Sequence, residues 1–160
     1  MKLRDWVLGT TVASAGLLLY GAMVEAHKLS VERRYLRLPR WPRRLDGYRT
    51  ALLADLHLQD AGTVDLAQRA VTVALDSVPD MVCIVDDFVS RWKSESPRII
   101  CDVLEPLLAM EGQVVAIPGN RDYKEGNADL LGSILNELNI HLLRNEVWHH
   151  DGINWVGIDS

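Results

Sequence analysis

The chain has 160 residues, of which 48% are hydrophobic and 24% charged, and its formal net charge is −5. This length suits one globular domain with one further hydrophobic element, and the composition excludes a disordered or collagen-like chain. Two cysteines in separate apolar stretches exclude both a disulfide framework and a Cys-x-x-Cys metal site.

The charge is unevenly distributed along the chain. Residues 1–49 hold ten of the seventeen basic residues and four of the twenty-two acidic ones, so this part is +6 and the remainder −11. Nucleic-acid binding through side chains requires basic clusters, so the acidic globular part argues against nucleic acid as a partner. A cation-binding site suits this part better.

Residues 6–24 contain no charged side chain. A helix of this length would span roughly 28 Å, which is close to the hydrocarbon thickness of a bilayer. We therefore predict that residues 1–25 form a single transmembrane anchor or uncleaved signal. A cleavable signal peptide is one alternative, because small residues around Ala26 offer a cleavage site, and a buried core helix is the other.

Residues 26–47 are predicted to be a basic linker, since Pro39 and Pro42 interrupt regular structure and Trp41 could anchor at a membrane interface. Basic residues are more numerous after the apolar segment than before it. The positive-inside rule then predicts a single-pass membrane protein with its globular part in the cytoplasm. The same basic stretch could instead lie on anionic headgroups of either leaflet.

The rest of the chain alternates between predicted strands and helices. Thr63, Ser96 and Asn127 are the expected caps of three helices, and Pro106 should kink or end the second one before Met110. A hairpin through Asp151 and Gly152 should lead into the last strand. Four apolar runs ending in polar residues are predicted to be strands, namely residues 50–54, 81–85, 114–117 and 155–158.

This alternation predicts an α/β fold with a largely parallel sheet and helices packed on its faces. In such sheets ligands bind at the carboxyl ends of the strands. Each polar residue found there is common in turns when considered alone. Together, however, they should gather along one edge of the sheet: Asp55, His57, Asp86, Asp87, Asn120 and Asp122.

The order of these residues resembles the motifs of the calcineurin-like metallophosphoesterases, which are Asp-x-His, then Gly-Asp, then Gly-Asn-His-Asp or -Glu. The resemblance begins at about Tyr48 and is strongest for the membrane-anchored phosphodiesterase subfamily. It implies that residues 48–160 are the N-terminal half of a four-layer αββα sandwich. The matching stretches are residues 54–58, 86–89 and 119–123, with residues 143–146 and 156–159 matching the subfamily.

The resemblance also implies a two-metal centre that takes Mn, Fe, Zn or Mg. Asp55, His57 and Asp87 would hold the first divalent cation, and Asp87 would bridge to a second that Asn120 also binds. Two cations about 3.5–4 Å apart clamp a phosphoryl group in such centres. At the catalytic positions this chain has two residues of very different chemistry, Arg121 and Asp122.

Three departures from the family pattern lead us to expect weak activity or none. Asp86 stands where the family has glycine, and Arg121 replaces a histidine although a guanidinium cannot act as a general acid near pH 7. The chain ends at Ser160, before any Gly-His-x-His segment, so at least three histidine ligands are expected to be missing. His149 and His150 lie in the expected hairpin and are poor substitutes.

The resemblance implies metal-dependent hydrolysis of phosphate mono- or diesters, with membrane or nucleotide-lipid substrates such as UDP-diacylglucosamine. The alternative is a truncated, degenerate family member that binds metal or phosphate weakly without catalysis. If the second sheet of the sandwich is missing, one face of the first sheet should expose apolar side chains, and a partner could cover it.

Overall fold

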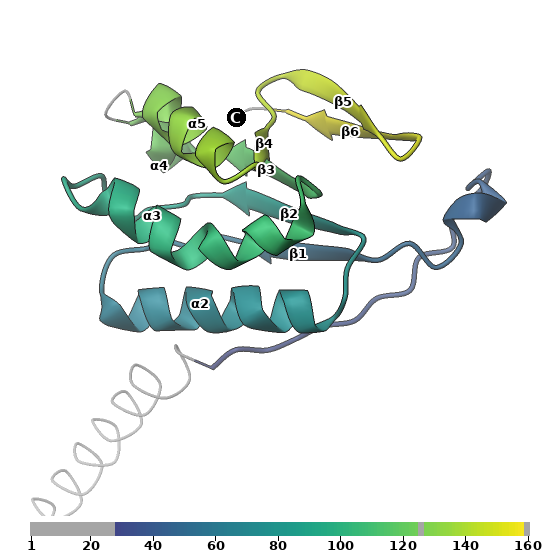
Figure 1. The fold of residues 1–160 in the computed structure, drawn as a ribbon, viewed down its shortest axis with the longest axis horizontal. Coiled ribbons are helices and arrows are strands. Elements are labelled where there is room, and N and C mark those ends of the chain that lie inside the picture. The colour runs from purple at the N-terminus through teal and green to yellow at the C-terminus, as the bar shows by residue number, and fades with distance from the viewer. Residues whose placement is uncertain (1–27, 125–126, 159–160) are drawn as a thin grey trace, which may run out of the picture. The chain divides into compact units, whose positions relative to one another are not determined.

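The computed structural model describes residues 28–124 and 127–158 (Figure 1). The predicted anchor, residues 1–25, lies outside these ranges. Within the described residues, no helix is both long enough and apolar enough to cross a bilayer. The chain divides into two units, Met1–Arg33 and Arg34–Ser160. The described part of the first, residues 28–33, has no regular structure, and all helices and strands of the described residues belong to the second.

Four strands form a parallel sheet in the order β1-β2-β3-β4. The first three are predicted apolar runs. β2 and β3 are mostly buried, as predicted, whereas every residue of β1 is exposed or half-buried. This arrangement confirms the predicted α/β class with a parallel sheet. The strands are β1 (Thr50–Ala54), β2 (Met81–Asp86), β3 (Val114–Pro118) and β4 (His141–Leu142).

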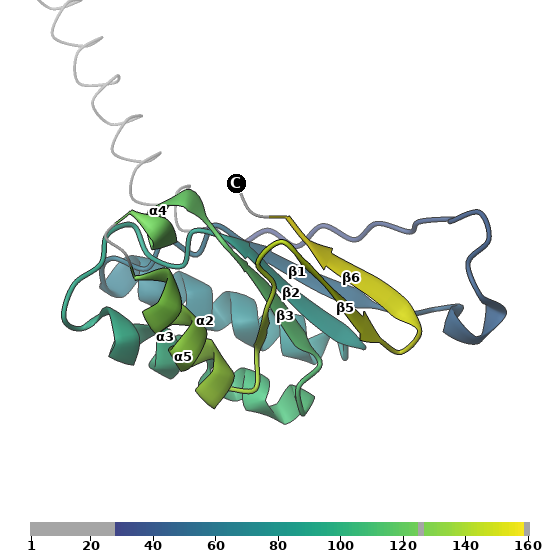
Figure 2. The ribbon, with the colours of Figure 1, turned by 90° about the horizontal axis from the view of Figure 1, so that it is seen from above.

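Three helices, α2 (Ala61–Asp76), α3 (Ser96–Leu104) and α5 (Ala128–Glu137), lie on one side of the sheet (Figures 1 and 2). Their apolar faces and the facing strand residues form the main core. Residues of this core that are fully buried include Val71, Ile84, Ile100, Leu104, Leu131 and Leu135.

The helix ends agree with the sequence in part. Thr63 was expected to cap α2, but Asp60 is the cap, and Thr63 is the third helical residue of a reciprocal capping box with it. Asn127 does precede α5, without a capping bond from its side chain. Ser96, expected as the cap of α3, is its first helical residue. That helix gives way to the 3₁₀ helix η3 (Glu105–Met110) at the proline, as predicted.

Residues 155–158 were predicted to form a strand reached through a hairpin, and both features are present. They overlap β6 (Ile153–Gly157), which pairs antiparallel with β5 (Glu146–His150) in a separate sheet. The predicted hairpin turn explains why: Asp151 and Gly152 have φ angles of 52° and 72°, which favour a tight reversal between adjacent antiparallel strands. The place beside β3 is taken by β4, a strand of two residues that gives no periodic signal.

The hairpin covers part of the sheet face opposite the helices. Trp148 and Trp155 pack against Met81, Val115 and Leu143 on this face, and Figure 2 shows the hairpin and the helices on opposite sides. One apolar side chain of the sheet, Leu52 in β1, remains 66% exposed.

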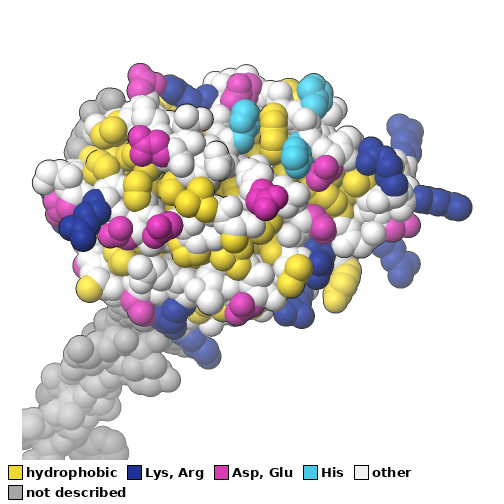
Figure 3. Space-filling model, viewed as in Figure 1, with side chains coloured by type: hydrophobic (Ala, Val, Ile, Leu, Met, Phe, Trp, Pro, Cys, Tyr) yellow, Lys and Arg dark blue, Asp and Glu magenta, His cyan; other side chains and the backbone are white. Residues whose placement is uncertain are grey.

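Acidic and basic side chains are distributed differently over the surface. Figure 3 shows acidic side chains scattered over the visible face, whereas Lys and Arg gather most densely at the end of the molecule that carries the 3₁₀ helix η2 (Arg43–Leu45). The helix η2 at this basic end is part of the predicted linker, residues 26–47. The carboxyl ends of the parallel strands lie away from it (Figure 1).

Candidate metal centre

Three loops that follow neighbouring parallel strands deliver the polar residues of the site. Asp55 and His57 follow β1, Asp87 follows β2, and the short helix α4 (Asn120–Tyr123) follows β3. The first two loops stay paired beyond the strands, because His57 N donates to Asp87 O at 3.0 Å and Leu58 N donates to the carbonyl of the residue after Asp87 at 2.9 Å. This pairing fixes the relative positions of the two loops.

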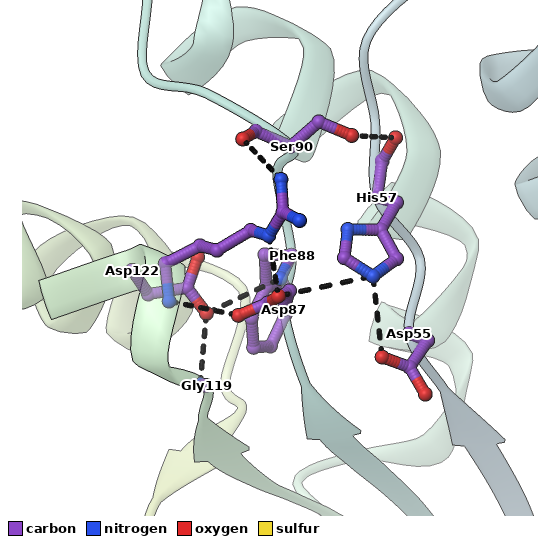
Figure 4. A network of polar contacts seen from close by, with 8 residues as sticks. Asp55, His57, Asp87, Phe88, Ser90, Gly119 and Asp122 are labelled. Carbon is purple, nitrogen blue, oxygen red and sulfur yellow. Dashed lines mark hydrogen bonds and ion pairs between the residues drawn. The ribbon is translucent and has the colours of Figure 1, made fainter. Parts of the chain in front are cut away.

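Asp55, His57 and Asp87 form a compact group of potential ligands (Figure 4). One ligand atom from each lies within 4.8 Å of the other two. His57 Nε2 is 3.2 Å from Asp55 Oδ1 and 3.8 Å from Asp87 Oδ2. Two carboxylates and one imidazole make a donor set that suits Zn²⁺, Mn²⁺ or Fe²⁺. The chemistry and spacing of the group fit one divalent cation.

The backbone of the site is unusual. Asp55, His57 and Asp86 all have left-handed φ angles, of 54°, 45° and 67°. Residues with side chains rarely adopt this conformation, and such residues cluster at functional sites where the surrounding structure holds them. The value at Asp86 also explains why glycine would suit this position. The side chain of Asp86 is exposed and is not a member of the ligand group.

Asp87 is held firmly by the loop after β3. Its side chain is 12% exposed, and the backbone N–H of Arg121 donates to its Oδ1 at 2.9 Å. Gly119 lies against the same oxygen so closely that there is no space for a side chain at position 119. Gly119 is therefore required here for close packing against Asp87.

Asp122 is fully buried and braces the same loop. Its Oδ2 accepts hydrogen bonds from the backbone N–H groups of Gly119 at 3.0 Å and Phe88 at 3.2 Å. Burial is the largest influence on this carboxyl, opposed by these N–H groups, and it raises the pKa of Asp122 to about 6. Oδ1 has no hydrogen-bond partner among the described residues. The side chain thus ties together the loops after β2 and β3.

Arg121 spans the centre. Its Nε is 3.1 Å from Asp87 Oδ2, and its Nη1 donates to the backbone carbonyl of Ser90 at 3.1 Å. The Ser90 hydroxyl in turn donates to the carbonyl of His57 at 3.1 Å. Ser90 therefore links the loop that carries His57 to the guanidinium, and no motif in the sequence indicated this role.

The structure brings together some of the predicted site residues and leaves others apart. Asp55, His57 and Asp87 form the ligand group, and Arg121 and Asp122 both contact the loop that carries Asp87. Asn120 is exposed at the start of α4, and its predicted role in holding a second cation stays a prediction.

The two histidines of the hairpin have partners of their own. His149 Nδ1 is 2.7 Å from Asn154 Oδ1, and His150 Nε2 is 3.4 Å from Asp151 Oδ2. The ring of His150 also stacks on Trp148, with the ring centroids 4.4 Å apart. Among the described residues neither histidine belongs to the ligand group, and the view that they are poor substitutes for metal ligands stays a prediction.

Comparison with known proteins gives one informative relative. No family model matches the chain. The chain is 29% identical over 148 residues to a zebrafish (Danio rerio) protein named transmembrane protein with metallophosphoesterase domain. The alignment covers 89% of this chain but 32% of the relative, so the chain spans about a third of the relative's length.

Proposed function

We propose that this chain contributes the N-terminal half of a metallophosphoesterase domain, with ligands for its first metal ion, and that the domain hydrolyses phosphate mono- or diesters. The observation that carries the proposal is the ligand group of Asp55, His57 and Asp87 at the carboxyl ends of β1 and β2. The name of the zebrafish relative supports it independently. We also propose that the described sheet is one of two in a four-layer αββα sandwich.

The ligand group, Arg121 and Asp122 would have separate roles in the reaction. A divalent cation held by the group would supply Lewis-acid polarisation of a phosphoryl group. Arg121 carries a fixed positive charge and a planar set of donors, so it can bind and orient a phosphoryl oxygen but cannot donate a proton near pH 7. Asp122 contacts backbone amides and would act by positioning the loop.

Membrane attachment and the substrate class are further parts of this proposal. Residues 6–24 carry no charge, and the relative's name includes the word transmembrane. An anchored enzyme would meet lipid-linked phosphoesters, including nucleotide lipids, at the bilayer surface. Resistance of the full chain to extraction from membranes by alkaline carbonate tests the attachment.

Hydrolysis of bis-p-nitrophenyl phosphate by the full chain with Mn²⁺ tests the activity. Asp87→Asn should abolish it, because an amide removes one of the two carboxylate charges of the ligand group. Asp65→Asn is the matched control, because Asp65 is an exposed helical aspartate paired with Arg69. Equal activity in wild type and Asp87→Asn would contradict the proposal. Mn²⁺ binding without hydrolysis would favour the alternative, a non-catalytic metal-binding module.

A further inference from the structure

We propose that Arg121 and a divalent cation compete for the same oxygen of Asp87, and that the guanidinium displaced by the cation binds the phosphoryl group of the substrate. This inference rests on the proposed function and deepens it, because it makes loading of the metal a precondition for binding the substrate. Arg121 stands where the family pattern has a histidine, so the proposed competition concerns a residue in which this chain departs from that pattern.

The competition follows from the geometry of Asp87. Oδ1 already accepts the backbone N–H of Arg121 at 2.9 Å. Oδ2 faces His57 Nε2 at 3.8 Å on one side and Arg121 Nε at 3.1 Å on the other. Oδ2 is therefore the oxygen of Asp87 available to a cation bound by the group, and the guanidinium of Arg121 occupies part of its coordination space.

Electrostatics point in the same direction. The Asp87 side chain is 12% exposed, so the positive charge of Arg121 is only partly screened where it meets this carboxylate. A divalent cation at the ligand group would repel a guanidinium in contact with the same carboxylate. Removing the guanidinium should therefore strengthen the binding of the cation.

Displacement of the guanidinium is structurally feasible. The Arg121 side chain is 47% exposed, and its other hydrogen bond goes to the Ser90 carbonyl at the surface of the site. The backbone contact to Asp87 Oδ1 does not depend on the side chain and would keep Asp87 in place. A displaced guanidinium would remain tethered beside the centre, where its donors match the oxygens of a phosphoryl group.

The first test is the affinity for Mn²⁺, measured by isothermal titration calorimetry on the full chain in detergent. We expect Arg121→Gln to bind Mn²⁺ about tenfold more tightly than wild type, as expected for loss of one partly screened charge. Arg121→Lys keeps the charge and should stay close to wild type. Arg69→Gln is the matched control, because Arg69 has similar side-chain exposure, 48%, and an Nε–carboxylate distance of 2.9 Å in α2.

The second test is the affinity for inorganic phosphate with and without Mn²⁺. Wild type should bind phosphate more tightly in the presence of Mn²⁺, and Arg121→Gln should lose about tenfold in phosphate affinity when Mn²⁺ is bound. Unchanged or weaker Mn²⁺ binding by Arg121→Gln would overturn the competition, and unchanged phosphate binding would overturn the role of the displaced side chain. Failure of all variants to bind Mn²⁺ would instead contradict the metal centre itself, and with it the proposed function.

Discussion

Gly119 lies directly against Asp87, since a β-carbon at position 119 would be 2.4 Å from Asp87 Oδ1 and 2.5 Å from its backbone nitrogen. Contacts this short are not tolerated, and the nearest backbone atoms belong to the loop after β2, which cannot move as a flexible side chain could. The absence of a side chain at residue 119 therefore allows the close packing that positions Asp87, a candidate ligand that follows a different strand.

Replacing this glycine should damage the metal centre. We expect Gly119→Ala to weaken Mn²⁺ binding by at least about tenfold, because overpacking of this kind costs about 1–3 kcal/mol and would displace Asp87. Calorimetric titration with Mn²⁺ measures the effect. Gly132→Ala in α5 is the control, because its β-carbon would meet Leu142 at an ordinary 3.5 Å, and it should leave Mn²⁺ affinity unchanged. Normal Mn²⁺ affinity of Gly119→Ala would show either that Asp87 is not a ligand or that the loop after β2 can shift to accommodate the added β-carbon.

Burial of Asp122 should make stability depend on pH. Its folded pKa of about 6 lies above the ordinary value of 3.8, so the folded state binds a proton that the unfolded state releases between these two values. The free energy of unfolding of the metal-free protein should therefore fall as pH rises from about 4 to 6, by about 3 kcal/mol at 1.36 kcal/mol per pKa unit. Above pH 6 this loss is complete, and below about pH 4 it is absent.

Asp122→Asn provides the comparison, because its amide oxygen can still accept the hydrogen bonds from Gly119 and Phe88 but does not titrate. Urea unfolding of both proteins at a series of pH values would give the difference. We expect the variant to become more stable relative to wild type as pH rises through this window. Parallel pH profiles for the two proteins would show that the folded state does not shift this carboxyl.

The sequence predicted three strands of the parallel sheet and the edge at which the ligand group lies for one physical reason. A strand buried on both faces must be apolar along its length, so the first polar residue after it marks the carboxyl edge of the sheet. Asp55 satisfies this rule directly, whereas His57 and Asp87 lie one or two residues further on and were assigned as ligands from the family resemblance. Their mutual distances follow from the order of β1 and β2 in the sheet, which the apolar pattern alone does not specify.

Other features of the site could not be predicted because they depend on tertiary contacts. Arg121 reaches Asp87 and Ser90 across two loops, and nothing in the sequence near Ser90 distinguishes it from an ordinary loop serine. The fourth strand of the sheet, β4, has only two residues, His141 and Leu142, so the apolar pattern could not place it beside β3. Pairing of β6 with β5 is different, because the turn at Asp151 and Gly152 predicts an antiparallel hairpin from the sequence itself.

The two cysteines should differ in reactivity. Burial raises the pKa of the Cys83 thiol to about 11, so only about one thiol in a thousand is ionised at pH 8, and the thiolate is the reactive form. Cys101, on α3, also has a raised pKa, with burial as the main cause, but its shift is smaller. Iodoacetamide at pH 8, followed by peptide mass spectrometry, should modify Cys101 well before Cys83. Equal rates of modification would indicate that the sheet face around Cys83 opens readily.

Val78, which follows the C-terminal cap of α2, has a strained backbone conformation that a glycine at this position should relieve. It has a φ angle of 49° although its side chain is β-branched and 64% exposed, and its N–H donates to the Leu75 carbonyl at 2.8 Å. A left-handed conformation costs a residue with a side chain about 1–2 kcal/mol, whereas glycine adopts it freely. Val78→Gly should therefore raise the free energy of unfolding by about 1 kcal/mol, as measured by urea denaturation, since little buried contact is lost.

The matched control for this variant is Thr72→Gly, which also replaces an exposed β-branched residue of α2 but in the right-handed interior of the helix. Glycine there should lower stability by a few tenths of a kcal/mol, because it gains no conformational relief and loses helix propensity. Opposite signs for the two substitutions would locate the strain in the left-handed backbone at Val78. Destabilisation of similar size by both would mean that the valine side chain makes contacts whose loss outweighs the relief of strain.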